Sequence, residues 1–278
     1  MLASGFKWSE GPTWFDSSVV FSDVPNNVAY QWKEGAKEAS VFLKPSGSSD
    51  GKGQGSNGLA HDAQGHLLLC QHGDRCVARL EKDGKFTRLA DKFEGKRFNS
   101  PNDLVVHSRG TIFFTDPPYG LSGGMTSKDK ELDFSGVFRL DSDGKVTALI
   151  KTLFFPNGIA LSPDEKTLYV AVSEKLNPHI MAYNIDGTNG RKVFDATPLM
   201  SAKRPGSCDG MKVDQKGNLW CTGPGGVLIL SKEGRHLGSI ITGQPTGNCT
   251  FGDDGSTLYI TANMFLVRVK TKVKGTGF

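Results

Sequence analysis

The hydrophobic positions of this chain fall in short runs that polar turns separate. Residues 156–161 (PNGIAL) form one run, residues 162–166 (SPDEK) form a turn, and residues 167–170 (TLYV) form a second run. Runs this short, rich in β-branched and aromatic residues and bounded by turn formers, predict β-strands. Helical periodicity is almost absent, so the pattern predicts an all-β fold.

The same pattern occurs six times along the sequence. Each copy begins with an oxygen-bearing side chain at one equivalent position, and these positions lie 47, 45, 55, 52 and 39 residues apart. Such a period is typical of a propeller blade of four antiparallel strands. The copies therefore predict a single six-bladed β-propeller domain over residues 1–278. The six equivalent positions, called the ring residues below, are Glu10, Asn57, Asn102, Asn157, Asp209 and Asn248.

Later strands and tight turns also recur within the copies. Residues 77–80 (VARL) precede Asp83-Gly84, and residues 137–140 (VFRL) precede Asp143-Gly144. Asp-Gly between two strand patterns is a strong hairpin signal. The last copy ends after its third strand, so we expect the N-terminal segment 3–7 to supply the missing outer strand. This pairing would close the ring and remove its unpaired edges.

Composition narrows the class of protein. The 278 residues include 35 Gly, and the net charge of +4 comes from scattered side chains without a Lys/Arg block, which argues against a nucleic-acid partner. No apolar run approaches the roughly 20 residues of a membrane helix. The N-terminus lacks the pattern of a signal peptide, so we expect a cytoplasmic protein, or a periplasmic one if a signal was removed. Five cysteines without a CxxC pair predict buried, reduced thiols.

Two stretches interrupt the repeats. Residues 44–56 are rich in Gly and Ser, which predicts a mobile loop. Residues 116–135 are too long for a hairpin connection and leave a strand near a ring residue, so we interpret them as a lid. Plain tolerance of surface insertions is the alternative for both.

The ring residues suggest chemistry. The innermost strands of a propeller line its central channel, so these side chains should converge there. Glu10 and Asp209 offer carboxylates and the other four offer amides, without His or Cys. Such oxygen donors suit one hard divalent cation, with Ca²⁺ preferred and Zn²⁺, Mn²⁺ or Mg²⁺ as alternatives. Turn chemistry alone would explain Asn-Gly and Asp-Gly, but it explains Glu10 poorly.

Five segments carry a resemblance to a known family. They are residues 9–12 (SEGP), 97–104 (RFNSPNDL), 114–120 (FTDPPYG), 155–159 (FPNGI) and 209–211 (DGM). As a set they resemble the gluconolactonase/regucalcin family, also called SMP-30/gluconolactonase/LRE-like, and they are most similar to its bacterial gluconolactonases. The resemblance covers essentially the whole chain. It implies a six-bladed propeller with one catalytic divalent metal and hydrolysis of sugar lactones.

The resemblance also implies roles for particular ring residues. Glu10, Asn157 and Asp209 match the family's metal ligands, and Asp209 would also serve as the acid/base residue. Asn102 matches either a fourth metal ligand or a substrate-binding Asn. Whether Asn57 and Asn248 contact the ion stays open.

Other residues are candidates for substrate binding. The regucalcin Arg and Asn that bind substrate lie two residues apart, directly before Asp-Gly, whereas here Arg97 and Asn99 stand earlier in the segment. His72 follows a second strand and could reach the channel mouth, although a surface histidine is the favoured interpretation. Asp116 and Tyr119 could line the pocket or only fix the loop.

The sequence therefore predicts a metal-dependent hydrolase that opens sugar lactones. A small-molecule lactone is the expected partner, without nucleic acid or membrane, and no feature indicates an oligomeric state. Two alternatives remain. One is hydrolysis of phosphotriesters or other lactones at the same metal site, although Thr250 stands in the region where related phosphotriesterases carry a His. The other is a non-enzymatic binding platform with a structural cation.

Overall fold

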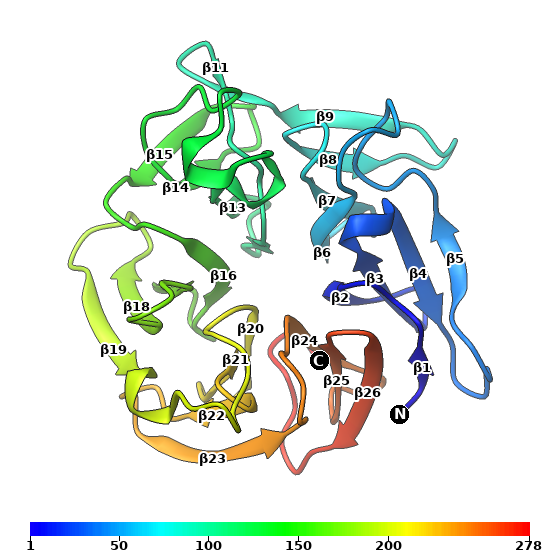
Figure 1. Cartoon of the computed structure of the whole chain (residues 1–278), viewed down its shortest axis with the longest axis vertical. Coiled ribbons are helices and arrows are strands. Elements are labelled where there is room, and N and C mark those ends of the chain that lie inside the picture. Colours follow the sequence, from blue (N-terminus) through cyan, green and yellow to red (C-terminus); the bar gives the residue numbers. More distant parts are fainter.

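The computed structural model describes residues 1–278 and confirms a six-bladed β-propeller. Six four-stranded antiparallel sheets surround a central axis (Figure 1). Within a blade the strands follow one another from the axis to the rim, because short turns join each strand to its neighbour in the sequence. Four antiparallel strands per blade agree with the predicted repeat unit.

The strand bounds of the first three blades are as follows: blade 1, β2 (Ser9–Phe15), β3 (Ser18–Asp23), β4 (Val28–Trp32) and β5 (Ser40–Leu43); blade 2, β6 (Ser56–His61), β7 (Leu67–Gln71), β8 (Cys76–Leu80) and β9 (Phe86–Ala90); blade 3, β12 (Leu104–Val106), β13 (Ile112–Asp116), β14 (Gly136–Leu140) and β15 (Val146–Ile150). A short hairpin, β10 (Lys92–Phe93) with β11 (Lys96–Arg97), precedes blade 3.

The other three blades continue the order: blade 4, β16 (Pro156–Leu161), β17 (Thr167–Val172), β18 (His179–Asn184) and β19 (Arg191–Asp195); blade 5, β20 (Met211–Val213), β21 (Leu219–Gly223), β22 (Gly226–Leu230) and β23 (His236–Ile241); blade 6, β24 (Asn248–Gly252), β25 (Thr257–Ala262), β26 (Phe265–Lys270) and β1 (Ala3–Ser4). Four short 3-10 helices are η1 (Val24–Asn26), η2 (Pro118–Gly120), η3 (Gly124–Thr126) and η4 (Thr197–Leu199). None of the helices has the length and apolar character needed to span a membrane.

The N-terminal strand closes the ring, as the repeat pattern predicts. Ala3 pairs with Leu266, so β1 is the outermost strand of blade 6 (Figure 1). Backbone hydrogen bonds from Leu2 N to Leu266 O (2.8 Å) and from Gly5 N to Met264 O (3.1 Å) extend the contact on both sides. Of the predicted segment 3–7, only two residues join the ladder, because the chain then turns toward the axis to begin β2.

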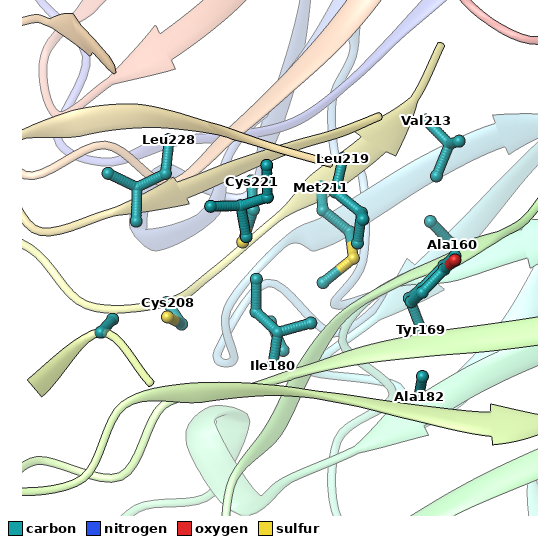
Figure 2. Close-up of a cluster of buried hydrophobic side chains, with 13 residues drawn as sticks. Ala160, Tyr169, Ile180, Ala182, Cys208, Met211, Val213, Leu219, Cys221 and Leu228 are labelled. Carbon is teal, nitrogen blue, oxygen red and sulfur yellow. The ribbon is translucent and has the colours of Figure 1, made fainter. Parts of the chain in front are cut away.

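The hydrophobic core lies mainly between neighbouring blades. Its largest cluster has 13 buried side chains from blades 4 and 5, and Figure 2 shows Ile180 of blade 4 facing Met211 and Cys221 of blade 5. Alternation along the strands sends side chains to both faces of each blade, so every blade is buried against two neighbours. All five cysteines are buried free thiols, as predicted.

The innermost strands are irregular at the ring residues. The ladder register shifts between Glu10 and Thr13 in blade 1, between Ser56 and Leu59 in blade 2, and between Pro156 and Ile159 in blade 4. A bulge leaves its extra residue unpaired and re-aims the side chain. The ring residues of blades 3 and 5 precede their strands altogether. These local breaks direct the ring side chains toward the channel.

The Gly/Ser-rich loop 44–56 is packed at both ends and exposed at its tip, residues 49–53, so its predicted mobility stays a prediction. The Oδ1 atom of Asn27 accepts hydrogen bonds from the backbone N–H groups of Ser46 (3.0 Å), Gly47 (2.9 Å) and Ser48 (3.1 Å). Ser46 and Ser48 are buried. The glycines here permit close backbone packing, because a Cβ on Gly73 would lie 2.4 Å from that of Ser48.

We predict that ring closure depends on the backbone of β1. Leu2→Pro removes the N–H that donates to Leu266, a loss of about 1 kcal/mol. Thermal unfolding should shift down by about 2–4 °C for each kcal/mol in a chain of this size. Leu2→Ala, which keeps the N–H, is the matched control for lost side-chain packing. Equal melting temperatures for the two variants would contradict this role of the backbone pairing.

Candidate functional site

The ring residues lie together at the propeller axis. Glu10, Asn102 and Asn248 are each 2% exposed, Asn57 and Asn157 are buried, and Asp209 keeps partial exposure. The sequence grouping therefore identifies side chains that the fold brings into one channel. Their individual hydrogen bonds differ, and these bonds decide which atoms remain available to a ligand.

The Glu10 carboxylate accepts hydrogen bonds from residues at the start of its own strand. Trp8 Nε1 donates to Oε1 (3.1 Å) and the backbone N–H of Gly11 donates to Oε2 (3.0 Å). A Cβ on Gly247 would lie 2.4 Å from Oε1, so the glycine leaves room for the carboxylate. Burial raises the pKa of Glu10 to about 7, and the charge of Asp103 adds to the rise against the two hydrogen bonds.

The amides form a directed chain across three blades. Asn57 Nδ2 donates to Asn102 Oδ1 (2.8 Å), Asn102 Nδ2 donates to Asn157 Oδ1 (2.5 Å), and Asn157 Nδ2 donates to Ser173 Oγ (2.9 Å). Ser173 then donates to the carbonyl oxygen of Cys208. Asn157 Oδ1 thus accepts one hydrogen bond and keeps a lone pair, because a carbonyl oxygen has two.

His72 is part of this network. It is 1% exposed, and its Nε2 lies 3.2 Å from Asn102 Oδ1, so the surface interpretation is wrong. Its Nδ1 lies 2.9 Å from the Gln54 side-chain amide. Burial lowers the pKa of His72 to about 4, which leaves the imidazole neutral. In the tautomer that carries the ring proton on Nε2, His72 and Asn57 fill both lone pairs of Asn102 Oδ1, whereas Asn157 Oδ1 stays open to a ligand.

Asp103 is a channel carboxylate that the ring pattern misses. It is buried, its Oδ1 accepts from Leu104 N (2.9 Å), and its Oδ2 accepts from Asn248 Nδ2 (3.2 Å). Asn248 Oδ1 in turn accepts from Cys249 N (2.8 Å), so the Asn248 amide faces Asp103. The signal was present in the sequence. In four copies the residue after the ring residue is a glycine: Gly11, Gly58, Gly158 and Gly210. In the third copy this residue is Asp103.

Asp209 faces the same channel from blade 5. Burial, followed by the negative charges of Glu10 and Asp103, raises the pKa of Asp209 well above its ordinary value. The neighbouring Asn157 side chain lowers the pKa of Asp209 by a smaller amount. Neither Glu10 nor Asp209 forms an ion pair with a Lys or Arg within 4 Å. The channel therefore concentrates negative charge that side chains do not neutralise at close range.

This donor set fits a hard cation. Two uncompensated carboxylates and the open Asn157 oxygen are the oxygen ligands that Ca²⁺ takes, with water completing its shell. No group of three or more His, Cys, Asp and Glu side chains is placed to hold a metal, so a cation here needs the amide. Asn102 is the weaker candidate ligand, since its oxygen would first have to release a hydrogen bond.

Asp116 and Asn99 hold together the two ends of the segment 116–135, the predicted lid. The carboxylate of Asp116 accepts from the N–H groups of Asn99 and Ser100 (both 2.7 Å), and burial raises its pKa to about 7. Asn99 Nδ2 donates to the carbonyl oxygens of Asp116 and Phe134 (both 2.9 Å), which lie at the two ends of the lid. These bonds occupy the Asp116 carboxylate and the Asn99 Nδ2 group, so both residues position the loop, whereas the buried Asn99 Oδ1 has no hydrogen-bond partner.

Tyr119 is the lid residue that approaches the ring. Its aromatic ring stacks on Phe155 with centroids 5.7 Å apart. Burial and the charge of Asp209 raise the pKa of Tyr119, and the neighbouring Ser173 and Asn157 side chains act in the opposite direction. Tyr119 therefore forms part of the wall beside the candidate ligand Asn157.

Arg97 lies in a polar pocket of about 440 Å³ that adjoins the channel. The pocket is also lined by His72 and Arg75, by Gly120 and Leu121 of the lid, and by Glu131. Arg97 Nη2 donates to the carbonyl oxygen of Asp74 (3.2 Å) and does not reach the ring residues. No sequence pattern selects Arg75, since Arg97, Gly120 and Glu131 of the same pocket lie more than 20 residues away along the chain.

Comparison with known proteins bears on this site. The model of the SMP-30/Gluconolactonase/LRE-like region matches residues 8–264. The chain is 40% identical to a gluconolactonase of Zymomonas mobilis over 99% of its own length and 82% of that protein. It is 28% identical to the pentonolactonase XacC of Haloferax volcanii, over 58% of this chain and 52% of that protein.

Solved structures show the same architecture. A gluconolactonase from Xanthomonas campestris aligns with a TM-score of 0.83 and 33% identity, covering 99% of this chain and 88% of that one. A calcium-binding regucalcin from Agrobacterium tumefaciens aligns with a TM-score of 0.72 at 18% identity, covering 100% and 96%. At that identity the second likeness concerns the fold alone.

We predict that the channel carboxylates make stability depend on pH when no cation is bound. The pKa of Glu10 is 4.5 in the unfolded reference and about 7 in the folded chain. The folded state thus holds the proton more tightly, so this stabilisation is present below pH 4.5 and is lost as pH rises through about 7. In chelator, the melting temperature should fall more between these pH values for the native chain than for Glu10→Gln.

The same pair of proteins provides the control. Adding Ca²⁺ should raise the melting temperature of the native chain most at the higher pH, where Glu10 is ionised, and should raise that of Glu10→Gln less. Parallel pH profiles for the two proteins in chelator would contradict the raised pKa.

Proposed function

Since the chain belongs to the SMP-30/gluconolactonase/LRE-like family, we propose that it is a lactonase that hydrolyses sugar lactones with one divalent cation. Glu10, Asn157 and Asp209 would bind the cation, with Ca²⁺ as the preferred ion. The observation that carries the proposal is the pair of channel carboxylates, Glu10 and Asp209, which act on each other electrostatically, have no Lys or Arg within 4 Å, and share the channel with Asn157.

A bound divalent cation would supply polarisation of the lactone carbonyl and stabilisation of the oxyanion that develops there. The protein residues supply the proton transfers and the orientation. Asp209 takes a proton from the attacking water and delivers a proton to the ring oxygen as the ester bond breaks. The product is the open-chain hydroxy acid. Without a cation, burial and the charges of Glu10 and Asp103 raise the pKa of Asp209, and a bound cation would act in the opposite direction.

The amide side chains orient the substrate and the ligands of the cation. Asn102 has both carbonyl lone pairs in hydrogen bonds from Asn57 and His72, and these bonds fix which way its amide faces. We assign it to contacts with substrate hydroxyls, with ligation of the cation as the alternative. In its Nε2–H tautomer the neutral His72 donates to Asn102 Oδ1, and its role is to hold this amide. Tyr119 closes the wall on the other side of Asn157.

A phosphotriesterase receives less support than a lactonase. Thr250 occupies the region where a histidine would be expected for that activity, and its hydroxyl donates to the Phe251 carbonyl oxygen (3.3 Å). This side chain cannot act as a base, and it is buried. The names of the relatives also concern lactones.

We predict that lactone hydrolysis requires the cation. Opening of D-glucono-1,5-lactone, followed with a pH indicator and corrected for spontaneous hydrolysis, should fall to background in chelator. Ca²⁺ should restore it, and Zn²⁺, Mn²⁺ and Mg²⁺ are tested beside it. A phosphotriester such as paraoxon should give little turnover under the same conditions. A lactonase rate that chelator leaves unchanged would remove the metal from the proposal, and inactivity on every lactone would favour a binding platform.

We also predict that Asp209 is essential for turnover. Asp209→Asn keeps a similar shape but cannot accept the proton, so kcat should fall by about 100-fold or more. The melting temperature in chelator should not fall, because the substitution removes a repelling charge. Asp254→Asn, at an exposed turn, is the control that should retain the native rate. Full activity of Asp209→Asn would show that another residue transfers the proton.

A further inference from the structure

The polar pocket beside His72 contains two guanidinium groups with little compensating charge. Arg75 is 5% exposed, its Nε donates to the Phe98 carbonyl oxygen (2.6 Å), and its Nη2 has no hydrogen-bond partner. Its nearest carboxylate is Glu131, at 3.6 Å from Nη1. A buried guanidinium nitrogen without a partner is costly, which marks this site as one that lacks an acceptor.

Arg97 increases the unbalanced charge. Its guanidinium forms no ion pair with a carboxylate within 4 Å, and its positive charge acts on Arg75. The only carboxylate that joins the two residues is Glu131, which accepts from the backbone N–H of Arg97 (2.7 Å) rather than from its side chain. His72 is neutral here. The pocket therefore holds Arg75, Arg97 and Lys128 beside two exposed carboxylates, Asp129 and Glu131, and neither carboxylate pairs with the Arg97 guanidinium.

The backbone at Arg75 provides an independent observation. Arg75 has a φ of 58°, in the left-handed region, directly before β8. The equivalent positions before β4 and β22 carry Asn27 and Gly225, which tolerate this conformation far better. An unfavourable residue at a strained position points to a requirement for its side chain.

We propose that this pocket binds an anionic group of the lactone substrate, through the guanidinium groups of Arg75 and Arg97. The chain is then selective for sugar lactones that carry a carboxylate or a phosphate ester away from the reacting carbonyl. This inference rests on the proposed lactonase function and specifies its substrate class. Paired guanidinium groups suit both anions, because their N–H donors match two oxygens at once.

The pocket is placed to receive one end of a substrate held in the channel. His72 belongs to both, since it lines the pocket and hydrogen-bonds to Asn102 of the ring. Gly120 of the lid lines the pocket next to Tyr119, which contacts Asn157. A Cβ on Gly120 would lie 2.7 Å from those of His72 and Ser100, so this glycine keeps the wall between the two spaces thin.

The test compares three lactones with the cation-loaded enzyme. D-Glucono-1,5-lactone is neutral, 6-phospho-D-glucono-1,5-lactone carries a phosphate ester, and D-glucaro-1,4-lactone carries a carboxylate. At least one anionic lactone should have a kcat/KM about 10-fold or more above that of the neutral one, and the comparison of the two distinguishes phosphate from carboxylate. The preference should shrink as ionic strength rises.

The variants locate the effect in the pocket. Arg97→Gln, at a partly exposed position, should lower the ratio of anionic to neutral kcat/KM by about 10- to 100-fold. Arg75→Gln should lower this ratio by a similar factor, and its melting curve checks that the variant is folded. Arg88→Gln, at an exposed strand position, is the matched control for a lost positive charge and should leave the ratio unchanged.

Two results would overturn the inference while the lactonase proposal stands: a neutral lactone that is hydrolysed as well as the anionic ones, or variants that slow all three lactones equally. If no lactone is hydrolysed, the proposed function fails, and calorimetry with D-glucarate and 6-phospho-D-gluconate decides the anion site alone. Binding that Arg97→Gln weakens supports the site, and no binding contradicts it.

Discussion

The close approach of the inner strands around the axis is the constraint on which the rest of the structure depends. Neighbouring blades meet at the residues that follow the ring positions, and four of these residues have no side chain. A Cβ on any of them would lie 1.9–2.5 Å from the nearest atom of the next blade, so larger residues would force the blades apart. These residues are Gly11, Gly58, Gly158 and Gly210.

This close approach produces the electrostatics of the channel. It encloses Glu10, Asp103 and the partly exposed Asp209, and this removal from water raises the pKa of each carboxyl group. The amides between the carboxylates are fixed in one orientation by hydrogen bonds that run from blade to blade. The lid is held with comparable precision, because Asp116 and Asn99 join its two ends. A site with fixed dipoles needs little reorganisation when charge develops in it.

Repetition made much of this fold predictable from the sequence. Strand alternation, Asp-Gly turns and the spacing of the six copies are local patterns, and together they fix the blade number, the strand count and the closing role of the N-terminus. The ring residues could also be identified, because equivalent positions of equivalent blades must lie at the same distance from the axis. Membership of the family and the candidate ligands Glu10, Asn157 and Asp209 followed from the motifs around those positions.

Contacts between distant parts of the chain could not be predicted in this way. Asp103 meets Asn248 across 145 residues, and His72 reaches Asn102 across 30. Both contacts depend on how the closed ring aims each side chain, which no local pattern contains. The composition of loop 44–56 predicts mobility, but Asn27 in another turn accepts hydrogen bonds from three of its backbone N–H groups. The sequence by itself thus determined the repeating scaffold, whose rules act over a few residues. Only the tertiary structure decided which polar groups satisfy one another and which, in the channel and at Arg75, remain free to bind a ligand.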